Sequence, residues 1–217
     1  TNRINKMQLV NLVYVPTFLN FTAQAIILKR IKYIYSAKMA TVDLNGLGKG
    51  IWEELFKEHK DPLTGDSYPC WDSINTEDKP DNPQDADKCL FGMTSQGIQS
   101  DIIVNFIDIV ESEKLELLKK HTDTYNLDDK DYVESFVSPK VQTDFLIEEI
   151  SNLQLEHMTN GKLGIKQVTK RVDKDRVMAT MYGLYYIMKY ENNVFKETVN
   201  IDLSALLSVF KKPNVRA

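Results

Sequence analysis

Cysteine and histidine are scarce in this chain of 217 residues, which has only two cysteines and three histidines. Cys70 and Cys89 do not form a Cys-x-x-Cys pair and the histidines are scattered, so we expect no zinc cage. Two isolated cysteines favour free thiols in a reducing compartment over a disulfide. No apolar run reaches the ~18 residues that a membrane span requires, and no secretory leader is visible. We therefore expect a soluble, intracellular protein with no membrane partner.

Several catalytic signatures are missing as well. There is no Ser-His-Asp or Cys-His arrangement and no G-x-x-x-x-G-K-[ST] loop that would cradle a nucleotide phosphate. The acidic pair Glu148 and Glu149 lies on an amphipathic segment and is expected to face solvent. The net charge is −4 and the pI is 5.5, so a nucleic-acid partner would have to meet a local basic patch.

The hydrophobic pattern alternates between strand and helix along the chain. Strands are predicted at 11–18, 39–46, 89–95 and 161–168, and helices at 22–37, 48–59, 100–118, 142–158 and 175–192. An acidic connector is predicted at 127–140. The alternation predicts an α/β fold with a mixed central sheet flanked by helices.

The domain organisation predicted from this pattern is a single domain over 1–217. Residues 60–88 hold four of the seven prolines and seven aspartates, which predicts an irregular surface insertion without a core of its own. Trp71 is the expected exception, because its side chain should pack against the rest of the domain and anchor the insertion. Residues 193–217 are predicted to form a C-terminal extension.

Asp43 lies at the carboxyl end of a predicted buried strand and is followed at once by LNGLGKG. Ligands of open α/β sheets gather at the carboxyl ends of strands, and a carboxylate there, beside glycines that let a substrate backbone approach, can hold a cation. Two other interpretations stay open. Asp43 can form an Asx-turn that caps the next helix, or Gly46 and Gly48 can begin a degenerate dinucleotide loop.

Asp173 and Asp175 stand at the predicted start of the last helix. Capping alone can explain them, because acids at a helix N-terminus gain about 0.3–1 kcal/mol from the helix dipole. Capping leaves unexplained the basic residues that surround them, which are Lys166, Lys170, Arg171, Lys174 and Arg176. Positive charge of this density suits the approach of a phosphodiester backbone. A metal site that acts on a phosphate backbone is therefore the alternative to capping.

Taken together, these pieces occur in the order of a known protein family. They are QAIILKRI, ATVDLNGLGKGIWEEL, DPLTGDSYPCW, SPKVQTDFLIEEISNL and KRVDKDRVMATMYGLYYI, and with their flanks they extend from about Val13 to Asn192. In this combination the chain resembles the C-terminal nuclease domain of phage terminase large subunits, the DNA-packaging motor proteins.

The resemblance implies a ribonuclease-H-like fold whose clustered acids bind two divalent ions, Mg²⁺ or Mn²⁺, and cut concatemeric double-stranded viral DNA. Asp43 would be the second family carboxylate and Asp175 the last, with Asp173 assisting or replacing it. The residues implied to hold the DNA backbone are Lys166, Lys170, Arg171, Lys174, Arg176 and Lys49. The implied partners in a full motor are the portal protein and the small terminase subunit, in the host cytoplasm.

The chain departs from the family at its beginning. The family's first acid lies on the first strand of the domain, yet no Asp or Glu precedes Asp43. The family's upstream ATPase domain is also absent. A truncated form, an omission of residues or a prophage remnant would explain both. Without the first strand one edge of Met39–Asp43 would be open, and either Leu9–Val15, a second copy or omitted residues would have to fill it. The rival functions are a non-catalytic docking module for the portal or DNA and, more remotely, a nucleotide-binding domain.

Overall fold

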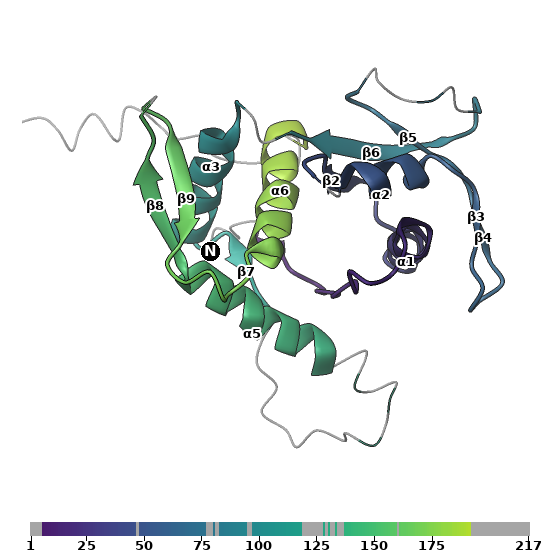
Figure 1. The fold of residues 1–217 in the computed structure, drawn as a ribbon, viewed down its shortest axis with the longest axis horizontal. Coiled ribbons are helices and arrows are strands. Elements are labelled where there is room, and N and C mark those ends of the chain that lie inside the picture. The colour runs from purple at the N-terminus through teal and green to yellow at the C-terminus, as the bar shows by residue number, and fades with distance from the viewer. Residues whose placement is uncertain are drawn as a thin grey trace, which may run out of the picture.

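The computed structural model describes residues 6–46, 48–76, 80, 83–94, 97–118, 128, 130, 133, 137–159 and 161–191. The helices in these ranges are α1 (Phe21–Ile34), α2 (Gly48–Leu55), α3 (Gln99–Glu111), α5 (Ser138–Ser151) and α6 (Asp175–Tyr190). The strands are β1 (Met7–Gln8), β2 (Ala40–Asp43), β3 (His59–Lys60), β4 (Ser67–Tyr68), β5 (Trp71–Ser73), β6 (Asp87–Met93), β7 (Leu115–Glu116), β8 (Leu153–His157) and β9 (Leu163–Gln167). The predicted α/β class is confirmed (Figure 1).

A parallel sheet of strand order β2-β6-β5 positions the candidate site. Asp43, the last residue of β2, lies opposite Met93 of β6. The antiparallel pairs, β3 with β4 and β8 with β9, belong to separate two-stranded ladders. The described strands therefore do not form the mixed central sheet that the sequence predicts. The hairpins pair with themselves because a short connection permits only antiparallel pairing.

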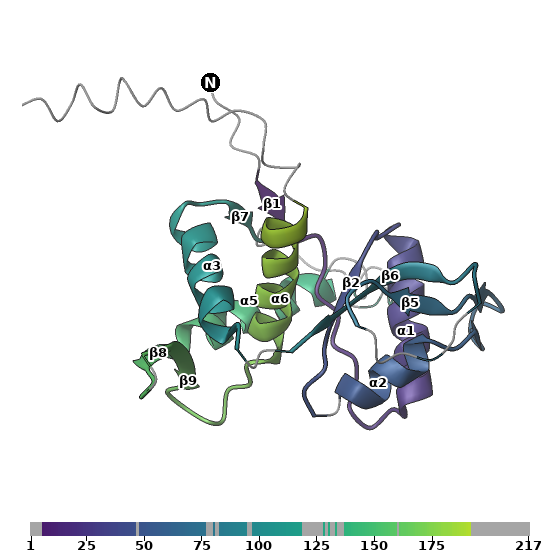
Figure 2. The ribbon, with the colours of Figure 1, turned by 90° about the horizontal axis from the view of Figure 1, so that it is seen from above.

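Strand β6 contributes to two hydrophobic clusters. Cys89 and Leu90 pack in a cluster with Trp52 of α2 and Ala25 of α1. Phe91, two residues after Cys89, belongs instead to the cluster built largely from α3 and α6. Figure 2 shows the two groups of helices on either side of β2 and β6. Because the sheet lies between both clusters, the carboxyl end of β2 is brought next to α6.

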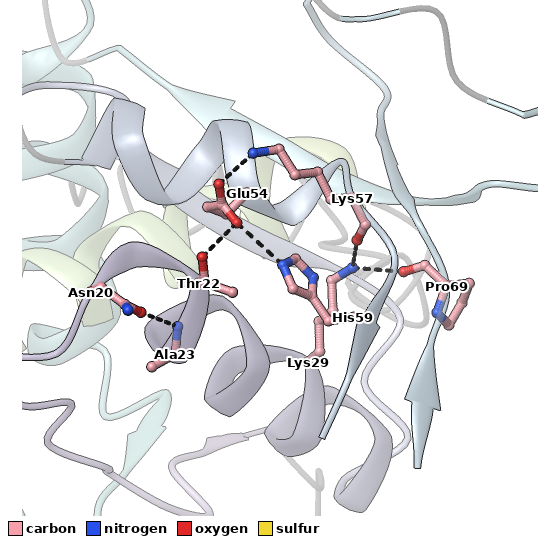
Figure 3. Close-up of polar contacts among 8 residues, drawn as sticks. All are labelled: Asn20, Thr22, Ala23, Lys29, Glu54, Lys57, His59 and Pro69. Carbon is pink, nitrogen blue, oxygen red and sulfur yellow. Dashed lines mark hydrogen bonds and ion pairs between the residues drawn. The ribbon is translucent and has the colours of Figure 1, made fainter. Parts of the chain in front are cut away.

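Helix α1 is anchored to the neighbouring hairpin by a buried lysine (Figure 3). The ammonium of Lys29 donates hydrogen bonds to the carbonyl oxygens of Lys57 and Pro69 and lies 5.5 Å from the centroid of the Trp71 ring. Burial lowers the pKa of Lys29 to about 8, because desolvation disfavours the charged form. At the start of α1, Asn20 caps the helix, since its side chain accepts from the amide of Ala23 at 2.8 Å.

The segment 60–88 is more ordered than the sequence predicts. It contains β4 and β5, and β5 is a member of the central sheet. The prediction of an irregular excursion is wrong for this part, because Trp71–Ser73 pairs in parallel with β6 and is buried, Asp72 included. The predicted anchor is confirmed, since Trp71 is fully buried.

The predicted strand at 11–18 does not form. The strand near this end is β1, which pairs in parallel with β7, and Val13, Tyr14 and Phe18 are exposed. Their β propensity is overridden because, among the residues that the structure describes, no strand pairs with them to receive their backbone hydrogen bonds. Within the described ranges β6 is the only strand paired with β2, so Leu9–Val15 does not fill the other edge. The predicted extension at 193–217 and half of the acidic connector at 127–140 lie outside the described residues.

No helix in the described ranges is both long and apolar enough to cross a membrane.

Candidate functional site

Asp43 sits in a turn that directs its two carboxylate oxygens differently. Oδ1 accepts hydrogen bonds from the amide of Asn45 at 2.9 Å and from Asn45 Nδ2 at 2.6 Å. This is the Asx-turn expected under the capping interpretation. Oδ2 lies 3.4 Å from the hydroxyl of Tyr182, which belongs to α6. The turn therefore occupies one oxygen, and the other faces α6.

The glycines after Asp43 serve the turn itself. Gly46 has a φ of 58°, a conformation that side chains disfavour. A Cβ added to Gly48 would lie 1.7 Å from the carbonyl oxygen of Asp43. Gly48 thus allows α2 to begin directly against the end of β2. The structure gives Gly46 and Gly48 a role in the chain's own turn, beside the substrate approach that the sequence suggests.

Asp175 is the first residue of α6, and its neighbour Lys174 caps the helix without a side-chain hydrogen bond. Met178 and Tyr182 follow Asp175 at three and seven positions, so all three lie on one face of the helix. This face is turned toward β2, because all three residues line the same pocket as Asp43. Tyr182, which touches Asp43, was not singled out by the sequence; its helical spacing from Asp175 is the pattern that could have found it.

The pocket between β2, α3 and α6 has a volume of about 460 Å³. Its lining residues are Thr41, Asp43, Asn45, Gln99, Lys174, Asp175, Met178, Ala179 and Tyr182. Asp43 and Asp175, far apart in the sequence, thus border one cavity rather than opposite faces of the molecule. That they share a cation stays a prediction.

The donor set of this pocket fits a hard divalent cation. Two carboxylates and the side-chain oxygens of Asn45 and Thr41 are ligands that Mg²⁺ and Mn²⁺ accept. Asp43 and Asp175 are the two acids on the wall of the pocket. The described part of the chain contains no group of three or more His, Cys, Asp or Glu side chains that could hold a metal ion.

Asp173 is placed apart from this pair. It is exposed and lines a smaller pocket of about 270 Å³ on the side of α5, together with Glu148 and Arg171. Asp173 and Asp175 are only two positions apart at the start of α6, yet Asp173 lies on the side of α5 and Asp175 faces β2. Its predicted assistance to the metal site stays a prediction.

The predicted DNA-binding residues differ in their surroundings. Lys166, Lys170, Arg171 and Lys174 are exposed along β9 and the turn that leads into α6. Lys174 also lines the pocket of Asp43, whereas Lys49 lines a different pocket beside Trp52. Arg176 is engaged within the protein, because its Nη1 lies 2.6 Å from Glu149 Oε1. A DNA-binding role for these residues stays a prediction.

Glu149 is the second residue whose role the sequence did not reveal. It is only 1% exposed, so the prediction that it faces solvent is wrong, whereas its neighbour Glu148 is exposed as expected. The difference arises because α6 packs against α5 and covers Glu149, a tertiary contact that helical periodicity alone does not reveal.

Comparison with known proteins gives no match to a family model, to a curated protein or to a solved structure.

Proposed function

We propose that this chain is a nuclease domain of a phage terminase large subunit, a divalent-metal-dependent endonuclease that cuts double-stranded viral DNA during genome packaging. The observation that carries the proposal is the pocket that Asp43 and Asp175 share. The order of the sequence motifs supports the same assignment, since Asp43 and Asp175 are the two acids that those motifs single out. The proposed setting is the host cytoplasm, with the portal protein and the small terminase subunit as partners and an ATPase domain in the full motor.

A ribonuclease-H-like arrangement is part of the proposal. Its support is the parallel pairing of β2 with β6, which puts Asp43 at a carboxyl end of the sheet, and the packing of α6 beside β2. Acids that arrive from a strand end and a helix start can converge only if the two elements meet at one edge. The contact between Tyr182 and Asp43 marks that meeting point.

In the proposed reaction Asp43 and Asp175 would hold Mg²⁺ or Mn²⁺. Two ions bound there would supply an activated water and would stabilise the leaving oxygen of a phosphodiester. Asn45 orients the carboxylate of Asp43 through the Asx-turn. Lys174, on the wall of the same pocket, attracts the phosphate that is cut, and the exposed Lys170 and Arg171 hold flanking phosphates by charge.

The experiment that tests the proposal is nicking of supercoiled plasmid in the presence of Mg²⁺ or Mn²⁺, with excess EDTA as the metal-free control. Asp43→Asn and Asp175→Asn should each abolish nicking. Asp101→Asn is the matched control, because Asp101 is an exposed acid in the first turn of α3 and does not line the pocket. Nicking that persists in EDTA, or in both pocket variants, would reject the proposal.

A non-catalytic docking module is the second candidate. One observation favours it: the described residues offer no group of three metal-binding side chains, and a site with only two carboxylates holds metal less tightly. The same assay separates the candidates. A chain that binds duplex DNA but leaves the plasmid intact with either ion would be a docking module.

A further inference from the structure

The first turn of α6 is capped from another helix. Its own N-cap residue, Lys174, makes no side-chain cap hydrogen bond, although the first amides of a helix have no partner within it. Glu149, near the end of α5, fills this role, because its Oε2 accepts from the amide of Val177 at 3.0 Å. Val177 is fully buried, so water cannot substitute for this acceptor.

The same carboxylate holds the side chain next to Val177. Glu149 Oε1 accepts from Arg176 Nη1 at 2.6 Å, and Arg176 Nε donates to Gln142 Oε1 at 2.8 Å. The guanidinium also lies 5.1 Å from the centroid of the Phe145 ring. Gln142, Phe145 and Glu149 are spaced by three and four positions, so they lie on one face of α5, and this face contacts the side chain of Arg176. We call Glu149, Arg176 and the amide of Val177 the α5–α6 clamp.

The clamp determines where Asp175 points. Successive residues of a helix project about 100° apart, so holding Arg176 and Val177 against α5 fixes the direction of the residue before them. Asp175 consequently faces the pocket toward β2, with Tyr182 on the same face in contact with Asp43. Without the clamp, the first turn would lose its acceptor and its fixed rotation.

We infer that Glu149 is a positioning residue of the candidate metal site: through Arg176 and the Val177 amide it holds Asp175 toward Asp43 and so raises the affinity of the pocket for a divalent cation. The inference rests on the proposed function of that pocket. Glu149 contacts the side of α6 that faces α5 and does not line the pocket of Asp43. Groups that are hydrogen-bonded directly to a metal ligand change metal affinity by about 10–100-fold, and Glu149, which acts one residue further away through Arg176 and Val177, should give an effect at the low end of this range.

The experiment compares Glu149→Gln with Glu148→Gln, the same change at the exposed neighbouring position on α5. Mn²⁺ affinity is measured by electron paramagnetic resonance, and exchange of the Val177 amide is measured by NMR. Glu149→Gln should weaken Mn²⁺ binding about tenfold and speed exchange at Val177, whereas Glu148→Gln should change neither. The double variant Glu149→Leu with Arg176→Met removes both charges and so leaves neither one buried without its partner. It still leaves the buried Val177 amide without an acceptor, so it should recover part of the thermal stability that Glu149→Gln loses but not the Mn²⁺ affinity.

Three results would overturn the inference, and they are distinguishable. If Glu149→Gln matches Glu148→Gln in Mn²⁺ affinity while the wild type binds Mn²⁺, the clamp does not position the site and the proposed function stands. If the double variant recovers affinity together with stability, Glu149 is only a packing residue. If the wild type binds no Mn²⁺, the proposed function fails as well, and faster exchange at Val177 in Glu149→Gln would then show a cap of the helix alone.

Discussion

The hydroxyl of Tyr182 lies 3.4 Å from Oδ2 of Asp43 and joins α6 to the end of β2. Because Asn45 already holds Oδ1, Tyr182 is a second side chain that orients this carboxylate. The phenol is almost fully buried, so the contact is fixed by packing. The distance between α6 and β2 is therefore part of the geometry of the candidate site.

Tyr182→Phe should therefore affect the site more than the fold. The change removes one long hydrogen bond, which is worth about 0.5–1.5 kcal/mol at most, so the thermal midpoint should move little. Mn²⁺ affinity and plasmid nicking should fall, because the carboxylate of Asp43 gains freedom to rotate. Tyr185→Phe is the matched control, as Tyr185 is a buried tyrosine on the same helix that does not line the pocket. Equal effects of the two changes would contradict the prediction.

The three aspartates should differ in the loss that each substitution causes. Asp43→Asn and Asp175→Asn should remove nearly all cleavage while the thermal midpoint stays equal or rises slightly, since like charges that face one pocket repel when no metal is bound. Asparagine also preserves the Asx-turn at position 43, because its side-chain oxygen can accept from Asn45. Asp173→Asn should be milder, because Asp173 lines the other pocket. Calorimetry and nicking rates measure the two effects separately, and large equal losses of stability would favour the capping interpretation.

Gly48 should tolerate no side chain. A Cβ there would lie 1.7 Å from the carbonyl oxygen of Asp43, so Gly48→Ala must move either α2 or the end of β2. Overpacking costs roughly 1–3 kcal/mol, and the end of β2 carries Asp43, so Mn²⁺ binding should fall too. Gly183→Ala is the contrast, because no atom lies within 4 Å of its added Cβ. It should stabilise α6 by about 0.5–1 kcal/mol; equal unfolding midpoints for the two variants would show that Gly48 is not confined as described.

Local chemistry explains which parts of the fold the sequence predicts. The helical periodicity of α1 and α6, the short strand β2 and the acid at its end are visible in the sequence because each depends on neighbours within a few positions. The burial of Glu149 and the placement of Asp173 away from Asp175 depend on how α5 packs against α6, and periodicity does not encode that contact. The strand predicted at 11–18 does not form because β propensity is a local property and cannot supply a pairing partner.

The basic residues near α6 should contribute unequally to DNA binding. Lys170 and Lys174 are exposed, so each can contact a phosphate. Substitution of either lysine with Gln should remove one such contact and make the plot of log association constant against log salt concentration less steep by about 0.9. Arg176→Gln should instead lower stability, because its guanidinium is committed to Glu149. Fluorescence anisotropy with a duplex at several salt concentrations measures the slope. A salt slope that changes for Arg176→Gln but not for the lysine variants would reverse this assignment.

The ion pair between Arg30 and Asp61 should make stability depend on acid pH. Arg30 Nε and Nη2 lie 2.6 and 2.7 Å from the two oxygens of Asp61, whose side chain is fully buried. The hydrogen bonds from Arg30 hold the pKa of Asp61 well below its ordinary value. A depressed carboxyl pKa contributes stability above the unfolded pKa of about 3.9 and loses it as the pH falls toward the folded value. Asp61→Asn should therefore cost roughly 3 kcal/mol at pH 7, the low end for a broken buried pair because Arg30 is partly exposed.

The difference in unfolding free energy between wild type and Asp61→Asn should shrink as the pH is lowered from 5 toward 2. The unfolded chain takes up a proton at Asp61 with a pKa of about 3.9, whereas the folded ion pair keeps its charge, so unfolding of the wild type becomes more favourable. Urea unfolding at a series of pH values measures this difference. Asp66→Asn, at an exposed position of the same hairpin, should show no such convergence. A cost for Asp61→Asn that stays constant from pH 7 to pH 3 would mean that the ion pair does not set the acid limb of stability, and that Asp61 acts only through its neutral contacts with the amide of Leu63 and the hydroxyl of Tyr68.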